Sequence, residues 1–517
     1  MHVIKRNPIM RKEKKHRHIV IILAVAAVAL AFRLPALSDR PMHGDEAVQA
    51  VKTGILWETG KAEYDPALYH GPTLAYLTVP VLWLTKAGDF AGTKEWMYRL
   101  VPALCGVALA LVPFLLAGEM GWVAATAAGL LLAISPVFVY YSRYYIQETP
   151  LVLFTALALA GGWRFLSGGT KALGFGPWWG ILAGTAAGLM LATKETAPLA
   201  LVAMIAAFLI VRRGRVDSRR FVMPGAVAAV IAALVFSGFL AHPTGILDAL
   251  RSPLNYLRLA AGGGDHVHPW HYYLGLLVWA RPQPGGPVWS EAAVIALSII
   301  GAWPRRAASR PGASLLKFLP WYTAFVFVLY SAIPYKTPWC VLTGYLGVVL
   351  LAGAGCAALV RSNRPVRTAA VLLLGVAGLH LGWQAWRGSF VFASDRRNPW
   401  VYAHPVEDVK RLGQLVQDLT SAHPDGRAML VRIVTPDYWP LPWYLRRLTR
   451  VGYWSAVPDA VDAPVVITSS ALEKAVDRRL DGDYQEMYFG LRPDSLLAVR
   501  VEAGLWRRFL RVGNAAP

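Results

Sequence analysis

Acidic residues are scarce in this sequence: 31 Asp and Glu stand against 52 Lys and Arg in 517 residues, and only 16% of all residues are charged. Soluble domains usually carry about 25% charged residues. With 56% hydrophobic residues and a mean hydropathy of +0.41, the composition is typical of a membrane protein. A net charge of +21 would suggest nucleic acid as a partner in a soluble chain, but here the basic residues gather in short loops between apolar runs.

Cysteine is also rare, and nucleotide-binding motifs are missing. The three cysteines, Cys105, Cys340 and Cys356, lie in or beside apolar runs without the spacing of a zinc site, so neither zinc nor disulfides are expected. There is no GxGxxG sequence and no P-loop, so a nucleotide-binding loop is not indicated. We find no internal repeat of 20–50 residues and no low-complexity tract.

Long apolar runs predict a polytopic α-helical membrane protein with about 11 transmembrane helices, since a bilayer core needs about 20 apolar residues per helix. The N-terminus is basic, and basic residues such as Arg164, Arg212 and Arg361 follow alternate runs, so all of these lie on one side, the cytoplasm. The expected spans are about 19–37, 98–118, 121–140, 149–167, 178–194, 197–212, 221–241, 287–303, 317–334, 339–360 and 368–386.

Two apolar segments need separate treatment. The run 19–36 follows a basic stretch without a convincing cleavage site, so we expect a retained signal anchor rather than a cleaved signal peptide. The segment 72–86 is apolar but only about 15 residues long and contains Pro80, which favours an interfacial or re-entrant helix. If this segment crossed the membrane, every later loop would change sides and the agreement of the loop charges would be lost.

The predicted topology divides the chain into three parts. Residues 1–18 form a basic cytoplasmic N-terminus, and residues 19–386 form the membrane domain, with outer loops 38–97 and 242–286. Residues 387–517 are predicted to form a small extracytoplasmic α/β domain. The apolar spans predict that the protein resides in the cell (inner) membrane. Short strand-like runs and intervening helical patterns support this domain; the strands are expected at 429–434, 464–468 and 496–501, and the helices at about 405–420 and 470–480.

The candidate catalytic residues, Asp45 and Glu46, come just after the first span. Carboxylates at a membrane surface are costly and suggest a functional site. Asp45 is a candidate general base for an incoming hydroxyl, with Glu46 orienting the acceptor or contacting a metal. His43 precedes them as a candidate substrate contact. The alternative is an ordinary acidic turn that caps a helix starting near Ala47.

Five further residues of the predicted outer face are candidate substrate contacts: His70, Arg143, Glu148, Lys194 and Lys336. Both lysines are candidate phosphate ligands, because ammonium groups bind phosphate as point charges. The alternatives are structural. Arg143 and Glu148 could pair with each other, Lys194 could pair with its neighbour Glu195, and His70 could belong to a simple turn-rich loop.

A histidine-rich segment at 265–273 contains an H-x-H-x-x-H pattern at His266, His268 and His271. Such a pattern can bind a metal ion. Only one carboxylate, Asp265, lies nearby, and aromatic clusters of this kind are common at membrane interfaces. No cofactor is assigned from the sequence, and a divalent metal ion is left open.

Taken in their order along the chain, several short motifs resemble the GT-C membrane glycosyltransferases. The nearer relatives are the dolichyl-phosphate-mannose–protein mannosyltransferases and the lipid A aminoarabinose transferases, and within that group the chain looks like the prokaryotic subfamily of flippase-activity-associated proteins. The motifs that carry the resemblance are HGDEA at 43–47, HGP at 70–72, RYYIQE at 143–148, YKTPWC at 335–340 and YWPLPWY at 438–444.

The resemblance implies a polyprenyl-phosphate-linked sugar donor and transfer on the outer face with inversion at the anomeric carbon. It places Asp45 at the reacting centre and Lys194 near the carrier phosphate; Glu148 corresponds less surely to an acid that is often Asp in relatives. The expected partners are the lipid-linked sugar, the membrane, and a glycan, lipid or protein acceptor, with no nucleic acid. The alternative function is a non-enzymatic accessory or translocation factor for lipid-linked glycans, which the subfamily name suggests.

Overall fold

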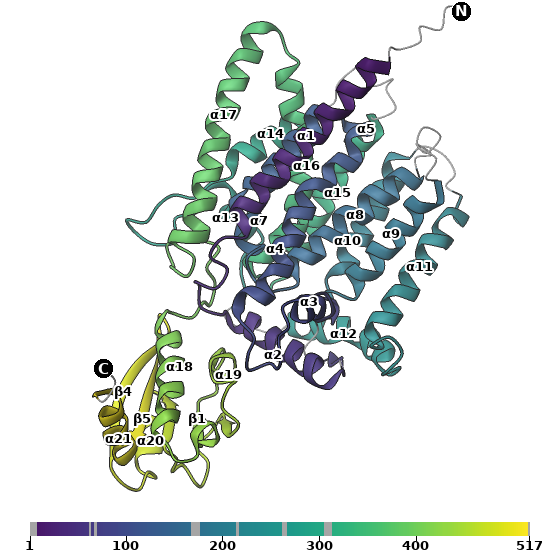
Figure 1. Ribbon diagram of the computed structural model, residues 1–517. Coiled ribbons are helices and arrows are strands. Elements are labelled where there is room, and N and C mark those ends of the chain that lie inside the picture. Colours follow the sequence, from purple (N-terminus) through teal and green to yellow (C-terminus); the bar gives the residue numbers. More distant parts are fainter. Residues whose placement is uncertain are drawn as a thin grey trace, which may run out of the picture. The chain divides into compact units, whose positions relative to one another are not determined.

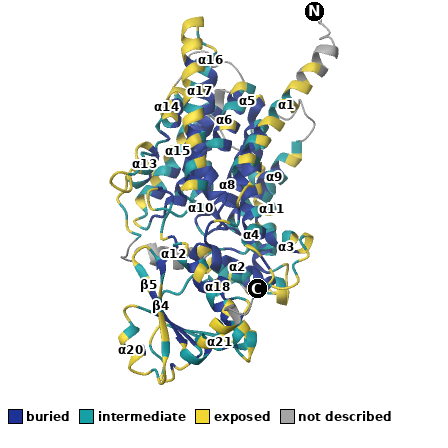
Figure 2. Cartoon of the chain, turned by 60° about the vertical axis from the view of Figure 1, so that its left-hand side comes forward, coloured by how far each residue is buried: buried dark blue, intermediate teal, exposed yellow. Residues whose placement is uncertain are grey.

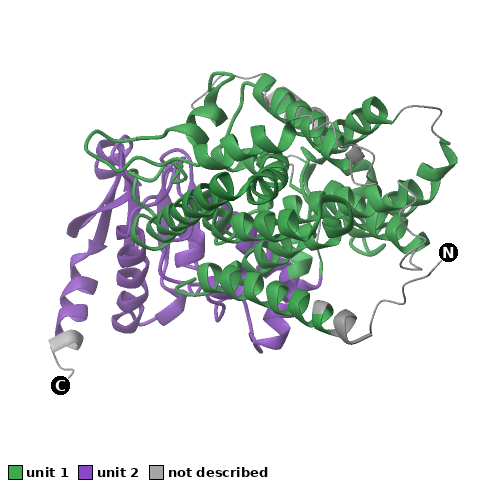
Figure 3. Ribbon diagram, turned by 90° about the horizontal axis from the view of Figure 1, so that it is seen from above, with its two compact units in different colours: residues 1–37, 61–77, 99–402 green, residues 38–60, 78–98, 403–517 purple. Residues whose placement is uncertain are grey.

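The computed structural model describes residues 8–61, 64–66, 70–166, 176–212, 217–260, 266–303 and 313–514. The chain forms two compact units, which Figure 3 shows in different colours. The first comprises Met1–Leu37, Lys61–Leu77 and Arg99–Tyr402. The second comprises Ser38–Gly60, Thr78–Tyr98 and Ala403–Pro517. The predicted outer loop 38–97 is therefore divided between the two units.

The first unit is a bundle of apolar helices (Figure 1). Most of these helices are uniformly apolar rather than amphipathic, as expected for segments surrounded by lipid or by one another. In chain order they are α1 (Pro8–Arg33), α4 (Glu95–Leu111, which begins in the second unit), α5 (Ala117–Met120), α6 (Trp122–Ile134), α7 (Pro136–Tyr141), α8 (Glu148–Leu166), α9 (Gly176–Leu191), α10 (Ala197–Val211), α11 (Arg219–Phe236), α12 (Gly245–Ala260), α13 (Tyr272–Val278), α14 (Ala292–Ala302), α15 (Ala313–Ala332), α16 (Val341–Val360) and α17 (Arg364–Trp386).

Seven helical stretches among the described residues are long and apolar enough to cross a membrane: Lys15–Arg33, Glu95–Met120, Glu148–Leu166, Arg219–Phe236, Leu315–Ala332, Pro338–Val360 and Arg364–Val391. The four remaining predicted spans coincide with the shorter helices α6, α9, α10 and α14. The polytopic helical prediction is confirmed. The doubtful segment 72–86 contains α3 (Thr73–Leu84), whose 12 residues extend only about 18 Å. That is shorter than a bilayer core.

Helix α16 lies at the centre of the bundle. It is buried along almost its whole length, whereas α17 exposes Leu372, Leu373 and Leu379. Figure 2 shows buried residues concentrated in the middle of the helical unit. Small residues allow this packing: a Cβ added at Gly355 would lie 2.0 Å from the carbonyl oxygen of Leu297 in α14. The close approach of two helix backbones is typical of membrane bundles.

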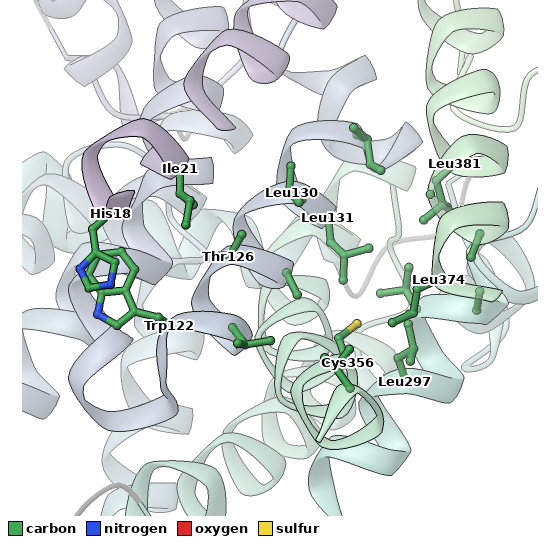
Figure 4. Close-up of a pocket in the computed structure, with 18 of the residues that line it drawn as sticks. His18, Ile21, Trp122, Thr126, Leu130, Leu131, Leu297, Cys356, Leu374 and Leu381 are labelled. Atoms are coloured by element: carbon green, nitrogen blue, oxygen red, sulfur yellow. The ribbon is translucent and has the colours of Figure 1, made fainter. Parts of the chain in front are cut away.

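An apolar groove of about 590 Å³ lies among α1, α6, α14, α16 and α17 (Figure 4). At one end, the imidazole of His18 stacks on the indole of Trp122 with ring centroids 3.5 Å apart. Elsewhere the lining is mostly aliphatic, with Leu131, Leu297 and Leu381 from three different helices. An apolar groove of this kind suits hydrocarbon rather than polar ligands.

The second unit combines α2 (Gly44–Thr59) with the C-terminal tail. The tail contains β1 (Val431–Val434), β2 (Val451–Trp454), β3 (Val465–Ser469), β4 (Tyr484–Arg492) and β5 (Ser495–Glu502). They form one sheet in the order β2-β1-β3-β5-β4. The pairs of β1 with β2 and β3 are parallel, whereas β5 pairs antiparallel with β3 and β4.

The predicted strands of the tail coincide with β1, β3 and β5, and its predicted helices coincide with α18 (Asp408–Leu419) and α20 (Glu473–Asp477). A small α/β tail domain is therefore confirmed. Sequence reasoning missed β2, β4, α19 (Leu441–Tyr444) and α21 (Ala503–Asn514). Strand β4 consists mostly of exposed and half-buried residues, so it offers little continuous apolar signal.

Candidate functional site

The start of α2 is fixed by a reciprocal capping arrangement. His43 is the N-cap residue, and its ring Nδ1 accepts a hydrogen bond from the backbone N–H of Asp45 at 3.1 Å. Glu46 is the third helical residue, and its carboxylate accepts from the backbone N–H of His43 at 2.9 Å. Both bonds satisfy N–H groups that a helix start leaves unpaired. This segment therefore does cap a helix, as the structural alternative predicts, but the N-cap residue is His43 and not Asp45.

Glu46 is completely buried and paired. Its carboxylate lies 2.9 Å from the guanidinium of Arg40, which also contacts Nε2 of His404 at 2.8 Å. Nδ1 of His404 lies 2.7 Å from the carbonyl oxygen of Pro405. Burial lowers the pKa of His404 well below its usual value, and the charges of Arg40 and His43 add to this effect. A neutral His404 therefore donates from Nδ1 and accepts at Nε2, which holds Arg40 against Glu46.

Asp45 has the opposite environment. Its side chain is 51% exposed, and its carboxylate lies 3.9 Å from Nδ1 of His43. The guanidinium of Arg492 lies near the same helix start, since a Cβ added at Gly44 would lie 3.9 Å from it. Burial lowers the pKa of Arg492, and the charge of Asp45 acts in the opposite direction. Of the adjacent carboxylates, Asp45 is thus the one that an incoming molecule can reach.

The aromatic motif of the tail packs against this helix start within the second unit. The hydroxyl of Tyr444 accepts a hydrogen bond from the backbone N–H of Met42 at 2.9 Å. The indole of Trp443 donates to Glu95 at 3.0 Å, and the guanidinium of Arg446 lies 3.7 Å from the centroid of the same indole. The segments at 43–47 and 438–444 therefore pack against each other.

In the first unit, Lys194 forms a buried ion pair with Glu148. Lys194 lies in the loop between α9 and α10, and Glu148 is the first residue of α8. The ammonium group also lies 3.8 Å from Sγ of Cys340. Burial lowers the pKa of Lys194, but the acidic groups around it, Cys340, Glu148 and Glu195, together raise it well above its usual value. Lys194 is therefore a cation held at the end of a membrane helix.

His70 and Glu195 form a second pair beside the first. Nδ1 of His70 lies 2.9 Å from a carboxylate oxygen of Glu195; the Glu195 side chain is almost fully buried, and that of His70 is 28% exposed. Burial raises the pKa of Glu195, but His70 and Lys194 outweigh that effect and lower it. The close ion pairs are therefore Lys194 with Glu148 and His70 with Glu195, although the charges of Lys194 and Glu195 also act on each other.

Arg143 has a structural environment. Its guanidinium donates to the carbonyl oxygens of Arg33, Pro35 and Ala36, at 2.7 to 3.1 Å, where α1 ends. The same group stacks 4.4 Å from the centroid of the Phe390 ring. These carbonyls have no intrahelical partner, so Arg143 caps α1.

Lys336 and the histidine-rich segment form an aromatic region. The Lys336 ammonium donates to the carbonyl oxygens of His268, at 3.0 Å, and Ile333, at 2.5 Å, and burial lowers the pKa of Lys336. His268 stacks on Tyr272 with ring centroids 4.1 Å apart, and Nδ1 of His266 lies 2.6 Å from the hydroxyl of Tyr402. Asp265 lies outside the described residues.

Metal binding gains no support from these positions. In the described part of the chain, no group of three or more His, Cys, Asp and Glu is arranged to hold an ion. The carboxylate oxygens of Glu46, the candidate metal contact, already accept from Arg40 and His43. The described residues therefore do not form a metal site, and we derive no step through a metal ion.

The candidate residues thus form two sets. Asp45, Glu46 and His43 belong to the second unit, and His70, Glu148 and Lys194 belong to the first. Sequence reasoning missed the roles of Glu195 and His404, whose partners are distant in sequence.

Solved structures of two membrane proteins have the same fold. ArnT from Cupriavidus metallidurans superposes with a TM-score of 0.65 at 17% identity, over 94% of this chain and 98% of that chain. The archaeal oligosaccharyltransferase AglB from Archaeoglobus fulgidus gives a TM-score of 0.60 at 12% identity, over 96% and 77%. No curated protein sequence matches the chain.

The chain has the fold of the GT-C membrane glycosyltransferases. Residues 71–242 match the family described as dolichyl-phosphate-mannose-protein mannosyltransferase. This segment includes the Lys194–Glu148 pair, and it begins one residue after His70. The matched segment contains the RYYIQE motif and most of the HGP motif, whereas the motifs at 43–47, 335–340 and 438–444 lie outside it.

Proposed function

We propose that this protein transfers a sugar from a polyprenyl-phosphate-linked donor to an acceptor on the outer face of the cell membrane. ArnT has been solved bound to undecaprenyl phosphate, and AglB in complex with a dolichol-phosphate and an inhibitory peptide. A sugar joined to a lipid phosphate already carries a good leaving group. The enzyme then needs a base for the acceptor hydroxyl and cations for the phosphate.

In this proposal the two adjacent carboxylates have different tasks. Asp45 is the general base, because its side chain is exposed at the start of α2. Glu46 orients it, because the buried pair with Arg40 and the bond to His43 fix the first turn of the helix. His43 holds the backbone of Asp45 through its ring nitrogen.

Lys194 contacts the carrier phosphate in this proposal. Glu148 and Arg143 shape that site, and His70 and Lys336 supply further substrate contacts. The observation that carries the proposal is the buried Lys194, since a lysine at the end of a membrane helix is expensive and usually marks a ligand pathway. Lys336 has two carbonyl partners, so a phosphate would have to compete with them.

The non-enzymatic alternative, an accessory or translocation factor for lipid-linked glycans, predicts no turnover. The test incubates the purified full chain in lipid vesicles with a panel of prenyl-phosphate-linked sugars and extracytoplasmic acceptors. Transfer by the natural chain that falls about 10²-fold or more in Asp45→Asn supports the proposal. Absence of turnover by the natural chain with every donor, while the lipids still bind, would favour the accessory role.

A further inference from the structure

The His70–Glu195 pair has the geometry of a proton-transfer dyad. One ring nitrogen, Nδ1, is held by the buried carboxylate at 2.9 Å. The other, Nε2, makes no hydrogen bond to any residue that the structure describes, and the ring is partly exposed. A carboxylate that fixes one ring nitrogen orients the imidazole and leaves the second nitrogen for chemistry.

The segment that carries His70 is docked tightly on the Lys194 loop. The backbone N–H of Gly71 donates to the carbonyl oxygen of Thr193 at 3.2 Å, and the hydroxyl of Thr73 donates to that of Ala192 at 2.6 Å. A Cβ added at Gly71 would lie 2.0 Å from the Ala192 oxygen, so only glycine fits there. His70 and Lys194 are therefore held in one rigid local structure.

The charges around Lys194 explain why phosphate binding needs a second cation. Lys194 is positive and Glu148 and Glu195 are negative, so the cluster carries a net charge of −1 while His70 is neutral. Protonation of His70 brings the net charge to zero and gives each carboxylate its own cation. A lone lysine flanked by two carboxylates attracts a phosphate poorly, whereas the same lysine beside an imidazolium attracts it well.

We propose that His70 is a catalytic residue whose Nε2–H binds the carrier phosphate and gives it a proton as the sugar departs, with Glu195 as its positioning residue. This inference deepens the proposed function and rests on it. The ligand is the phosphodiester of a lipid-linked sugar. In this proposal the histidine of the HGP motif donates a proton and is more than a general polar contact.

The step balances without any other reactant. The bond between the anomeric carbon and the phosphate oxygen breaks, and the electron pair stays on that oxygen, which takes the proton from Nε2 of His70. The acceptor oxygen bonds to the anomeric carbon and gives its proton to a general base. One proton thus leaves the acceptor and one reaches the phosphate, and solvent restores both groups.

Other titratable groups face the dyad. The charge of Lys194 acts on Glu195, and Glu148 pairs with Lys194. Sγ of Cys340 lies 3.8 Å from the Lys194 ammonium group. Burial raises the pKa of Tyr64 to about 12, so this hydroxyl remains neutral near pH 7. Asp65 and Asp248 act on Tyr64 from the neighbouring loop and α12.

The first experiment measures binding without turnover. The probe is methyl farnesyl phosphate, a phosphodiester whose charge stays constant between pH 5.5 and pH 8, bound to the full chain in detergent or vesicles. We expect binding about tenfold tighter at pH 5.5 than at pH 8, since a charge-assisted hydrogen bond contributes about that much. His70→Gln should remove the pH dependence, and His70→Lys should give tight binding at both pH values.

Glu195→Gln keeps a hydrogen-bond acceptor but removes the charge that stabilises the imidazolium. The midpoint of the pH dependence should therefore move about one unit lower, which loss of packing alone would not cause. His423→Gln, which alters a histidine of the tail, is the matched control and should behave like the natural chain. Binding of the natural chain that is flat with pH, or pH dependence that survives in His70→Gln, would overturn the inference.

The second experiment measures transfer. In the natural chain the rate should fall as pH rises and the imidazolium loses its proton, and His70→Gln should lose this basic limb while Asp45→Asn keeps it. A donor with a pyrophosphate link, which leaves more readily, should recover at least tenfold of the His70→Gln loss. No rescue would overturn the acid role. No transfer by the natural chain would overturn the proposed function instead. The binding experiment would still show whether His70 contacts the phosphate.

Discussion

Lys194 pairs with Glu148, 46 residues away in the sequence, and not with its neighbour Glu195. The two side chains come from different elements, the loop after α9 and the start of α8, and both are about 5% exposed. Removing one member of such a pair leaves an uncompensated buried charge, which is far more costly than removing both.

Lys194→Ala should therefore destabilise the first unit by about 3–5 kcal/mol and abolish transfer. The double variant Lys194→Ala with Glu148→Gln should recover part of the stability, because residue 148 no longer carries an unpaired buried charge, but none of the transfer. Thermal unfolding in detergent and the transfer assay check the two outcomes separately. Recovery of transfer in the double variant would show that Lys194 serves only to neutralise Glu148.

Asp45→Asn should leave thermal stability within about 0.5 kcal/mol of the natural chain, because the side chain is half exposed, yet reduce transfer about 10²–10⁴-fold. The matched control is Asp481→Asn, which changes an exposed acid of the tail. Unchanged transfer with normal expression would contradict the role of Asp45 as a base.

Glu46→Gln, unlike Asp45→Asn, should reduce the stability of the folded protein. The substitution removes the carboxylate charge that faces the buried Arg40 guanidinium and weakens the helix cap, so we expect a loss of about 3 kcal/mol or more. Hydrogen exchange over 44–59 should become faster than in Asp45→Asn. Exchange that is unaltered at this helix would mean that the Arg40 pair does not fix its start.

Gly71→Ala tests whether the His70 segment is held by close backbone contact. The new methyl group would lie 2.0 Å from the Ala192 oxygen, so the segment must move and both transfer and lipid-phosphate binding should fall. Gly88→Ala is the control, since a Cβ there meets nothing within 4 Å. Equal activity of both variants would show that this loop tolerates displacement.

The parts of the structure that sequence patterns predicted are those with local causes. Apolar runs of about 20 residues identify the membrane helices, and compact apolar stretches identified β1, β3 and β5. The sequence predicted which residues are candidates for the site, but it did not predict which of them form ion pairs with one another. Nothing in the neighbourhood of Lys194 distinguishes Glu148 from Glu195 as its partner, because that choice is made by the packing of α8 against α9.

The pKa of His404 provides a pH prediction for the second unit. Burial and Arg40 hold this pKa well below the value of about 6.5 expected in the unfolded chain. Below pH 6.5 the unfolded chain therefore binds a proton at His404 that the folded chain does not bind, so the stability falls as pH decreases. Above pH 6.5 the contribution of His404 to stability is fully present. Between pH 7 and pH 5 the unfolding temperature should drop, and His404→Asn, which cannot take up a proton, should show a smaller drop over this range. An identical pH dependence in the two proteins would mean that His404 is not held neutral, and that Arg40 must be fixed against Glu46 without it.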